Sequence, residues 1–364
     1  MIIKRLETFT RGQQISVVRL ETDSGHVGWG QLSPFNADIS AQVFHRQVAP
    51  LVLGVSLEEH EALSNRVITR TYKFPGTYVC RALVGLDTAL WDLRGKLAGQ
   101  PVYQMLGGVK RAVPAYGSSM RRDITPKEEA ERLARLRDTK GFRAFKLHTG
   151  HNTPLAITPQ LVEMDEMLPA VRKAVGDEIG LLVDVNGCYT AQEAIAQAGL
   201  LGDHRVCLFE EPCPNWELEW TAEVAAAYEI VVSGGEQDYD LKQWQRMVAM
   251  HCVDLAQPDV CYIGGLTRAL KAARMAEAAG MACIPHSANV SMVTLFALHL
   301  MAAIPNAGPW MEFSIEDSAW AKGIYSPVLE VVDGLVALPQ GPGWGVEVNT
   351  EWLAGAVRQV SELA

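Results

Sequence analysis

The chain has 364 residues, a formal net charge of −10 and 48% apolar residues, which is enough to bury a large core and is compatible with two domains. It has no cluster of Lys and Arg, so we expect neither nucleic acid nor an anionic membrane surface as a partner. The chain has no long apolar run and no secretory-signal pattern, so we expect a cytoplasmic protein. Its seven cysteines include no CxxC pair, and we expect them to be reduced thiols.

The first part of the chain has an antiparallel β pattern followed by helical patterns. Residues 15–34 contain two β-type runs on either side of the turn signal Asp23-Ser24-Gly25. Between Val79 and Gly99, leucines recur every three or four positions, which predicts an amphipathic helix that ends at the glycine. We therefore predict an N-terminal α+β capping domain over residues 1–112.

From Val113 onward, short apolar runs alternate with helix-like stretches. The eight runs read VPAYGSS, FRAFKLHTG, GLLVDVN, VCLFEEP, IVVSGGE, CVDLAQPD, MACIPHS and PWMEFS. This alternation predicts a modified TIM-like (β/α) barrel, which we place at residues 113–325. Residues 326–364 read as loop and short strand, and we expect them to return to the capping domain and complete it. The alternative, an open doubly wound sheet, is disfavoured because no glycine-rich phosphate loop follows the first run.

Three acidic residues, Asp184, Glu210 and Glu236, stand at the ends of three apolar runs and at equal intervals along the chain. Barrel enzymes build their sites at the C-terminal ends of the strands, so these carboxylates should meet at one point. A set of oxygen ligands suits Mg²⁺ better than zinc. We predict one Mg²⁺ per subunit, whose shell a substrate carboxylate completes. Three solvated acids at helix starts would be the alternative, but that would not explain the common interval.

The other runs also end in polar or ionisable side chains, namely Lys146, His148, Asn186, Gln257, Asp259, His286 and Glu312. Around one cavity such groups form a site. Asp259 could accept the Nδ1–H of His286, which would fix the tautomer of that imidazole and raise its basicity. Lys146, His148 and His286 are the candidate bases for removing a proton next to a carboxylate, and a lysine beside a metal and another cation should have a lowered pKa. Glu312, if protonated, could donate a hydrogen bond to the substrate carboxylate.

At these residues the chain resembles the enolase superfamily, in its mandelate racemase-like branch. The matching strings are FKLH, DVN, FEEP, GGE, QPDVCYIGGLT, PHS and MEF in the barrel, and GHVGWGQ and ALWDLRGK in the N-terminal part. The resemblance covers nearly the whole chain. It implies a capping domain over a barrel, and a Lys or His base that acts with Mg²⁺.

The resemblance also implies roles for individual residues. It makes Asp184, Glu210 and Glu236 the Mg²⁺ ligands. It makes Asp259 and His286 an Asp–His dyad.

Further implied roles concern the substrate and the second barrel strand. Glu312 looks like the group that hydrogen-bonds the substrate carboxylate, and Asn186 looks like a substrate contact or a neighbour of the metal ligands. Glu211 should point out of the barrel by strand alternation. The branch usually carries Lys-x-Lys on the second strand, where this chain has Lys146 and His148. A racemase needs two competent bases, so this change favours β-elimination over racemisation.

We therefore expect a Mg²⁺-dependent dehydratase of a sugar acid, an aldonate or an aldarate. It would remove the proton α to the carboxylate, form a metal-stabilised enolate and expel the β-hydroxyl to give a 2-keto-3-deoxy acid. The alternatives are a racemase, epimerase or cycloisomerase of the same superfamily, and a non-catalytic metal-binding barrel. Family resemblance alone suggests a homo-oligomer.

Substrate selection should involve the capping loops 32–38 and 70–76, because loops carry specificity on rigid scaffolds. The candidate contacts in these loops are Asn36, Arg70, Tyr72 and Lys73. A further histidine, His151, is expected at the mouth of the site.

Overall fold

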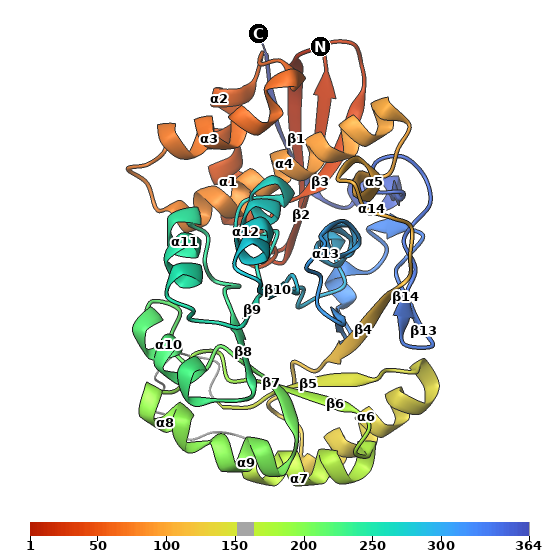
Figure 1. The fold of residues 1–364 in the computed structure, drawn as a ribbon. Helices are drawn as coiled ribbons and strands as arrows, with labels where there is room; N and C mark the ends of the chain where they lie inside the picture. The colour runs from red at the N-terminus through yellow and green to blue at the C-terminus, as the bar shows by residue number, and fades with distance from the viewer. Residues whose placement is uncertain (151–163, 364) are drawn as a thin grey trace.

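The computed structural model describes residues 1–150 and 164–363, so His151 lies outside the described residues. An α+β layer that contains both chain ends lies above a (β/α) barrel (Figure 1). The predicted fold class is therefore confirmed, while the domain boundaries after residues 112 and 325 stay predictions. Within the described ranges, no helix has the length and apolar character needed to cross a bilayer.

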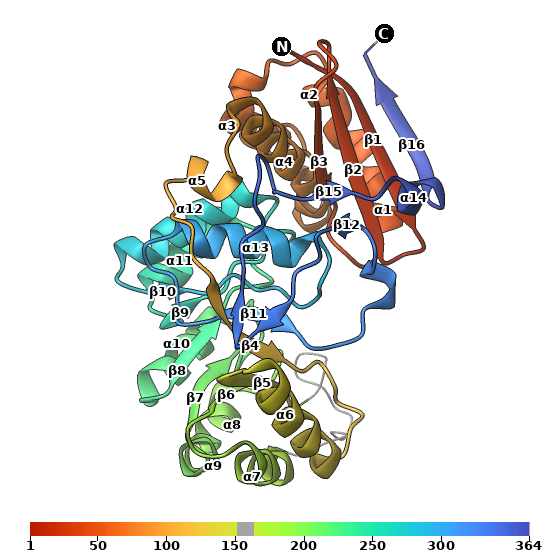
Figure 2. The ribbon, with the colours of Figure 1, turned by 90° about the vertical axis from the view of Figure 1, so that its right-hand side faces the viewer.

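The capping layer is built on one antiparallel sheet with the strand order β16-β1-β2-β3. Its elements are β1 (Ile3–Arg11), β2 (Ile15–Thr22), β3 (Val27–Gln31), α1 (Ala37–Val43), α2 (Ala49–Val52), α3 (His60–Arg70), α4 (Gly76–Ala98), α5 (Val102–Met105) and β16 (Val357–Glu362). The C-terminal strand β16 pairs with β1 at the edge of this sheet (Figure 2). The tail of the chain thus joins the N-terminal sheet.

The long helix α4 lies directly against β3 because two glycines leave room for it. A Cβ on Gly28 would lie 2.1 Å from the carbonyl oxygen of Ala89, and one on Gly30 would lie 2.4 Å from Oγ1 of Thr88. The helix ends where the sequence predicted, at Gly99, whose φ of 65° is a left-handed conformation that glycine adopts without strain.

The barrel contains all eight predicted strands, which are β4 (Val113–Ser118), β5 (Ala144–His148), β6 (Gly180–Asp184), β7 (Val206–Glu210), β8 (Val231–Gly234), β9 (Leu255–Ala256), β10 (Ala282–Cys283) and β11 (Met311–Ser314). Consecutive strands pair in parallel from β4 to β10, and β11 pairs in parallel with β4. Two backbone hydrogen bonds close the remaining gap, since Cys283 N donates to Asn306 O (2.8 Å) and Gly308 N donates to Cys283 O (2.9 Å). The sheet is therefore a closed barrel.

Helices surround the barrel (Figure 1). They are α6 (Pro126–Lys140), α7 (Met164–Val175), α8 (Ala191–Ala196), α9 (Ala198–Asp203), α10 (Leu218–Ala227), α11 (Leu241–Ala249), α12 (Leu266–Ala278) and α13 (Met292–Ala303). The C-terminal segment carries β12 (Tyr325–Ser326), β13 (Val331–Val332), β14 (Leu335–Val336), β15 (Glu347–Val348) and α14 (Thr350–Ala354).

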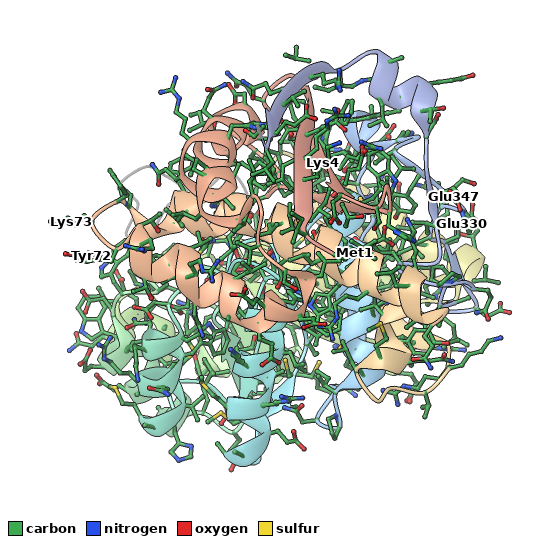
Figure 3. The ribbon with its side chains drawn as sticks, turned by 90° about the horizontal axis from the view of Figure 1, so that it is seen from above. Met1, Lys4, Tyr72, Lys73, Glu330 and Glu347 are labelled. Atoms are coloured by element: carbon green, nitrogen blue, oxygen red, sulfur yellow. The ribbon has the colours of Figure 1, made fainter. Side chains whose placement is uncertain are left out.

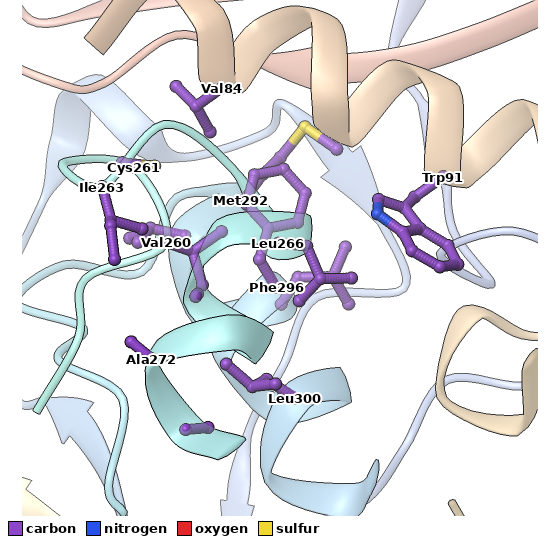
Figure 4. Close-up of a cluster of buried hydrophobic side chains, with 14 of the residues drawn as sticks. Val84, Trp91, Val260, Cys261, Ile263, Leu266, Ala272, Met292, Phe296 and Leu300 are labelled. Atoms are coloured by element: carbon purple, nitrogen blue, oxygen red, sulfur yellow. The ribbon is translucent and has the colours of Figure 1, made fainter. Parts of the chain in front are cut away.

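A large apolar cluster fixes the capping layer to the barrel. Val84 and Trp91 of α4 pack with Leu266 of α12 and with Met292 and Phe296 of α13 (Figure 4). Burying such side chains stabilises a structure by about 1.5–3 kcal/mol each. The capping layer is thus held above the same end of the barrel as the strand termini that carry the polar residues.

Candidate active site

The interior of the barrel consists of an apolar layer and, above it, a polar layer. Tyr116, Ala144, Leu182, Leu208, Leu255 and Ile284 form the apolar layer. Because side chains two positions apart on a strand share a face, the residues two positions further on point into the same space. Those residues include Lys146, Asp184, Glu210, Gln257 and His286, all of which are buried. The alternation of the strands therefore gathers the predicted polar residues at the C-terminal end of the barrel.

The three predicted metal ligands meet at the centre of this layer. One carboxylate oxygen from each of Asp184, Glu210 and Glu236 lies within 4.8 Å of the other two, and all three side chains are buried. Burial and the charges of Asp184, Glu312 and Glu236 raise the pKa of Glu210 to about 8, against the opposing charge of Lys146. Three buried carboxylates repel one another unless a cation lies between them. This acidic triad could therefore hold a metal ion, and its oxygen-only donors suit a hard dication.

Lys146 lies on one side of the acidic triad and is completely buried. Its Nζ is 2.5 Å from Glu210 Oε1, 2.9 Å from Glu312 Oε1 and 3.7 Å from Asp184 Oδ2. Burial by itself would lower the pKa of this lysine, but the charges of Glu210 and Glu312 outweigh it and raise the pKa well above its usual value. Carboxylates are the nearest neighbours of Lys146 in the structure, and the expected lowering of its pKa beside a metal and another cation stays a prediction.

His148 lies beside Lys146 on the same strand and has a defined orientation. Its Nδ1 is 2.5 Å from the backbone oxygen of Ser119, and a carbonyl can only accept, so Nδ1 carries a hydrogen. Its Nε2 is 2.9 Å from Asp184 Oδ2. Burial would raise the pKa of Asp184, but the charge and hydrogen bond of His148, together with Lys146, lower it. The ring edge with Nε2 thus faces the acidic triad.

His286 and Asp259 form the predicted pair on the opposite side. Nδ1 of His286 is 2.7 Å from Oδ2 of Asp259, and Nε2 is 2.9 Å from Oε2 of Glu236. The other oxygen of Asp259 accepts the backbone N–H groups of Cys261 (2.5 Å) and Tyr262 (2.9 Å). Burial would lower the pKa of His286, but Glu236, Glu312 and the hydrogen bond to Asp259 raise it well above its usual value. Asp259 therefore both orients the ring and favours its protonated form.

Glu312 is a further buried residue of the site with defined partners. It accepts hydrogen bonds from Ser118 Oγ (2.8 Å) and from Ser287 N (2.7 Å). Burial would raise its pKa, but the charges of Lys146 and His286 and the hydrogen bonds lower it to about 2. In the structure Glu312 accepts both hydrogen bonds, and a hydrogen bond from protonated Glu312 to a substrate carboxylate stays a prediction.

Two further predictions concern the loops that follow β6 and β7. Asn186 donates to both oxygens of Asp184, from its backbone N (2.7 Å) and from Nδ2 (3.1 Å), so it lies next to the acidic triad as expected. The second of these residues is Glu211, which is expected from the sequence to point out of the barrel. The strand ends at Glu210, the backbone of Glu211 turns to a φ of 43°, and its side chain is buried. Because its side chain also borders a small cavity with Thr221 of α10 and Met247 of α11, burial alone does not give its direction, which stays a prediction.

The four candidate contacts in the capping loops lie at the surface. Asn36, Arg70 and Lys73 are exposed, and Tyr72 is 74% exposed, with Tyr72 and Lys73 at the outer edge of the molecule when seen from above (Figure 3). Among the described residues, none of the four forms a hydrogen bond, ion pair or ring contact with the polar layer. Nζ of Lys73 instead lies 5.7 Å from the centre of the Tyr72 ring. Their role in binding stays a prediction.

A different capping residue, Arg81 on α4, is connected to the polar layer. Its guanidinium lies 3.7 Å from the centre of the Tyr262 ring, and that ring lies 5.9 Å from the ring of His286. Arg81 also donates to Ser33 Oγ (2.8 Å) in the capping loop 32–38. Sequence reasoning missed this connection, because the cation lies inside a helix and no motif indicates which side chain reaches the barrel.

A cavity of about 440 Å³ opens beside the acidic triad. Its described lining residues are Asn186, Gly187, Glu211, Pro214, Asn215, Trp216 and Gln237. A cavity of about 510 Å³, lined mainly by apolar residues, lies between α6, the outward side of β11 and the C-terminal segment. It carries none of the polar-layer residues or their hydrogen-bond partners, whereas the first cavity is lined by Asn186, which donates to Asp184, and by Gln237, which donates to Glu236.

A capping sheet above a barrel, with acids and opposing basic groups at the strand ends, is the arrangement of the enolase-type enzymes. Residues 128–352 match the family described as Enolase C-terminal domain-like, and residues 5–107 match the family described as Mandelate racemase / muconate lactonizing enzyme, N-terminal domain. The chain belongs to the mandelate racemase / muconate lactonizing enzyme family of the enolase superfamily. The predicted family and the assignment as an enzyme are confirmed.

Individual relatives show which reactions occur in this neighbourhood of the family. The chain is 30% identical to an arabinonate dehydratase from Saccharolobus solfataricus over 346 residues, which are 92% of this chain and 88% of that protein. It is 31% identical to a D-galactarolactone cycloisomerase from Agrobacterium fabrum over 353 residues, 93% of this chain and 89% of that protein. A crystal structure of a candidate racemase from Roseobacter denitrificans matches with a TM-score of 0.96 at 48% identity, over 100% of both chains. Further relatives are named as D-gluconate and D-galactonate dehydratases.

Proposed function

We propose that the protein is a Mg²⁺-dependent dehydratase of a sugar acid, which converts an aldonate or aldarate into a 2-keto-3-deoxy acid. The observation that carries the proposal is the placement of the acidic triad between two basic groups, the His286–Asp259 pair on one side and Lys146 with His148 on the other. The relatives named as sugar-acid dehydratases support it.

The acidic triad fits Mg²⁺, which when bound there would supply positive charge to the substrate carboxylate as electrons move onto it. The side chains of this chain would move the protons. Nε2 of His286 is the atom that exchanges a proton with the substrate, because Nδ1 is committed to Asp259. With Asp259 holding Nδ1, a proton on Nε2 of His286 could be donated to the departing β-hydroxyl, which leaves as water.

The opposite side of the site would position the substrate. Lys146 is held by Glu210 and Glu312, so its ammonium is a fixed positive charge next to the triad. Elimination needs one base and one acid, and one histidine can serve as both in succession. Which of His286, His148 and Lys146 removes the α-proton is part of the proposal to be tested.

A screen of aldonic and aldaric acids with Mg²⁺, scored by 2-keto acid formation, tests the reaction. We expect at least one acid to be converted, and we expect His286→Asn to lower turnover of that acid by about 10²- to 10⁴-fold, the usual contribution of general acid–base catalysis. Wild-type turnover by His286→Asn on every converted acid would contradict the assignment of His286.

A cycloisomerase or epimerase is the second candidate. The 31% identity to a D-galactarolactone cycloisomerase favours it, and basic groups on both sides of the triad could exchange an α-proton without loss of a hydroxyl. Incubation in deuterated water distinguishes the two reactions, because α-exchange without 2-keto acid formation supports the second candidate. A non-catalytic metal-binding barrel would show no exchange with any acid of the library.

A further inference from the structure

Arg122 is a cation beside the acidic triad that the proposed reaction does not yet use. It lies in the loop between β4 and α6, and its guanidinium donates to Oδ1 of Asn186. Asn186 in turn donates from Nδ2 to Oδ2 of Asp184 at 3.1 Å. One carboxamide therefore separates Arg122 from a predicted metal ligand.

The charge of Arg122 has no anionic partner among residues 1–150 and 164–363. No carboxylate oxygen of those residues lies within 4.0 Å of its nitrogens, and its Nε is buried without a hydrogen-bond acceptor. Burial lowers the pKa of Arg122, while the charges of Asp184, Cys188 and Glu236 act in the opposite direction. A partly buried cation is costly unless an anion pairs with it.

Neighbouring arginines show the usual arrangement in this part of the molecule. Arg121, the preceding residue, is paired with Asp123 at 2.5 Å and has 42% of its side chain exposed. Arg132 of α6 is paired with Glu316 at 2.8 Å. Arg122 differs from both because it has no carboxylate partner and its guanidinium donates to Asn186 beside the acidic triad, so a ligand is the available source of the anion.

We propose that Arg122 binds the second carboxylate of a dicarboxylic sugar acid whose first carboxylate lies at the acidic triad. The substrate class is then the aldarates rather than the aldonates, and this inference rests on the proposed function. Asn186 is hydrogen-bonded to both Arg122 and Asp184, so the guanidinium lies on the same side of the site as the acidic triad. The cavity of about 440 Å³ that Asn186 lines has room for the intervening polyol. The planar fork of arginine matches a carboxylate with two parallel hydrogen bonds.

Kinetics on paired substrates test the inference. We would measure kcat/KM of the Mg²⁺-loaded protein for each aldarate and for the aldonate of the same length and stereochemistry. Wild type should prefer the aldarate, and Arg122→Met should lower the aldarate-to-aldonate ratio by about tenfold to a hundredfold, as expected for a lost charge-assisted pair. Arg122→Lys should retain part of the preference, and the matched control Arg121→Met should keep the wild-type ratio.

Two outcomes would overturn the inference. If Arg122→Met lowers kcat/KM for both acids by the same factor, Arg122 only positions Asn186. If wild type converts aldonates as well as the matched aldarates, no second carboxylate is recognised.

Equilibrium binding separates this inference from the proposed function. Failure to convert any sugar acid would contradict the dehydratase proposal alone, and unreactive acids would still test Arg122. We expect wild type to bind adipate more tightly than hexanoate, and Arg122→Met to lose that difference. Equal binding of the two acids to wild type would refute the role of Arg122.

Discussion

Replacing Asp259 with Asn should disable His286 while leaving its surroundings in place. Asp259 holds His286 through Oδ2 (2.7 Å), and its Oδ1 accepts the backbone N–H groups of Cys261 and Tyr262. An asparagine can keep only one oxygen. If the oxygen stays with the two backbone donors, the new NH₂ group faces Nδ1 of His286 and must donate to it, so the proton of the neutral ring moves to Nε2.

The structure indicates which orientation the asparagine adopts. The reverse orientation would place the NH₂ group against two backbone donors and leave both without an acceptor. Each unsatisfied buried donor costs about 1–3 kcal/mol, so the orientation that blocks Nε2 is favoured by about 2–6 kcal/mol. With Nε2 protonated and the ring neutral, His286 can neither accept the α-proton nor act as a strong acid. We expect kcat to fall by about 10²- to 10⁴-fold.

The assay is 2-keto acid formation by Asp259→Asn, together with α-proton exchange in deuterated water and Mg²⁺ affinity by calorimetry. Mg²⁺ affinity should stay within a few-fold of wild type, because Asp184, Glu210 and Glu236 are unchanged. Asp254→Asn is a matched control, since Asp254 is exposed and lies just before β9, and among the described residues its side chain accepts a hydrogen bond only from the backbone N of Val232. A kcat within about threefold of wild type in Asp259→Asn would refute this account of the pair.

Three further predictions concern the buried charges. Lys146→Met should abolish turnover. Without Mg²⁺ it should also destabilise the fold by about 3 kcal/mol, because the buried carboxylates lose their counter-charge. The control Lys127→Met, at an exposed site, should change neither turnover nor stability, and an unchanged melting temperature in Lys146→Met would contradict the prediction. Chelation of divalent cations should stop turnover and lower the melting temperature, with recovery on adding Mg²⁺; full activity in excess chelator would exclude a metal role. His299 is buried, accepts from Tyr103 N (3.1 Å) and lies 3.2 Å from Trp344 O through Nε2, and burial lowers its pKa to about 3 despite the hydrogen bond to Trp344. The imidazole of His299 binds a proton more readily in the unfolded chain. Its contribution to the free energy of unfolding is therefore present above about pH 6.5 and is lost towards pH 3, by about 1.4 kcal/mol per pH unit. In urea unfolding, the free energy of unfolding of His299→Gln should fall less steeply with decreasing pH than that of wild type, and an identical slope would contradict the prediction.

The sequence predicted the parts of the site that follow from strand periodicity. Asp184, Glu210 and His286 lie where the alternation of their strands places them, because an apolar residue two positions earlier points into the same barrel. The ionisation of these groups could not be predicted in the same way. The pKa of Lys146 depends on which atoms surround Nζ, and those atoms come from strands far apart in the sequence.

Contacts made by loops and helix faces were also beyond the sequence. Arg122 and Arg81 follow no motif, and their positions depend on the path of a loop and on how α4 sits on the barrel. Periodicity therefore predicts which side chains of a strand point into the barrel, whereas contacts between different elements require the three-dimensional structure.

The stacking of Arg81 on Tyr262 joins the capping layer to the proton-transferring pair. The same residue, Tyr262, donates its backbone N–H to Asp259, so the cap and the orientation of His286 share one support. The free energy by which docking of the cap on the barrel favours the ordered His286 must then equal the free energy by which the ordered His286 favours docking of the cap. Binding energy from parts of the substrate remote from the reacting carbon can thus be used at that carbon, and shortened substrates should lose kcat as well as affinity.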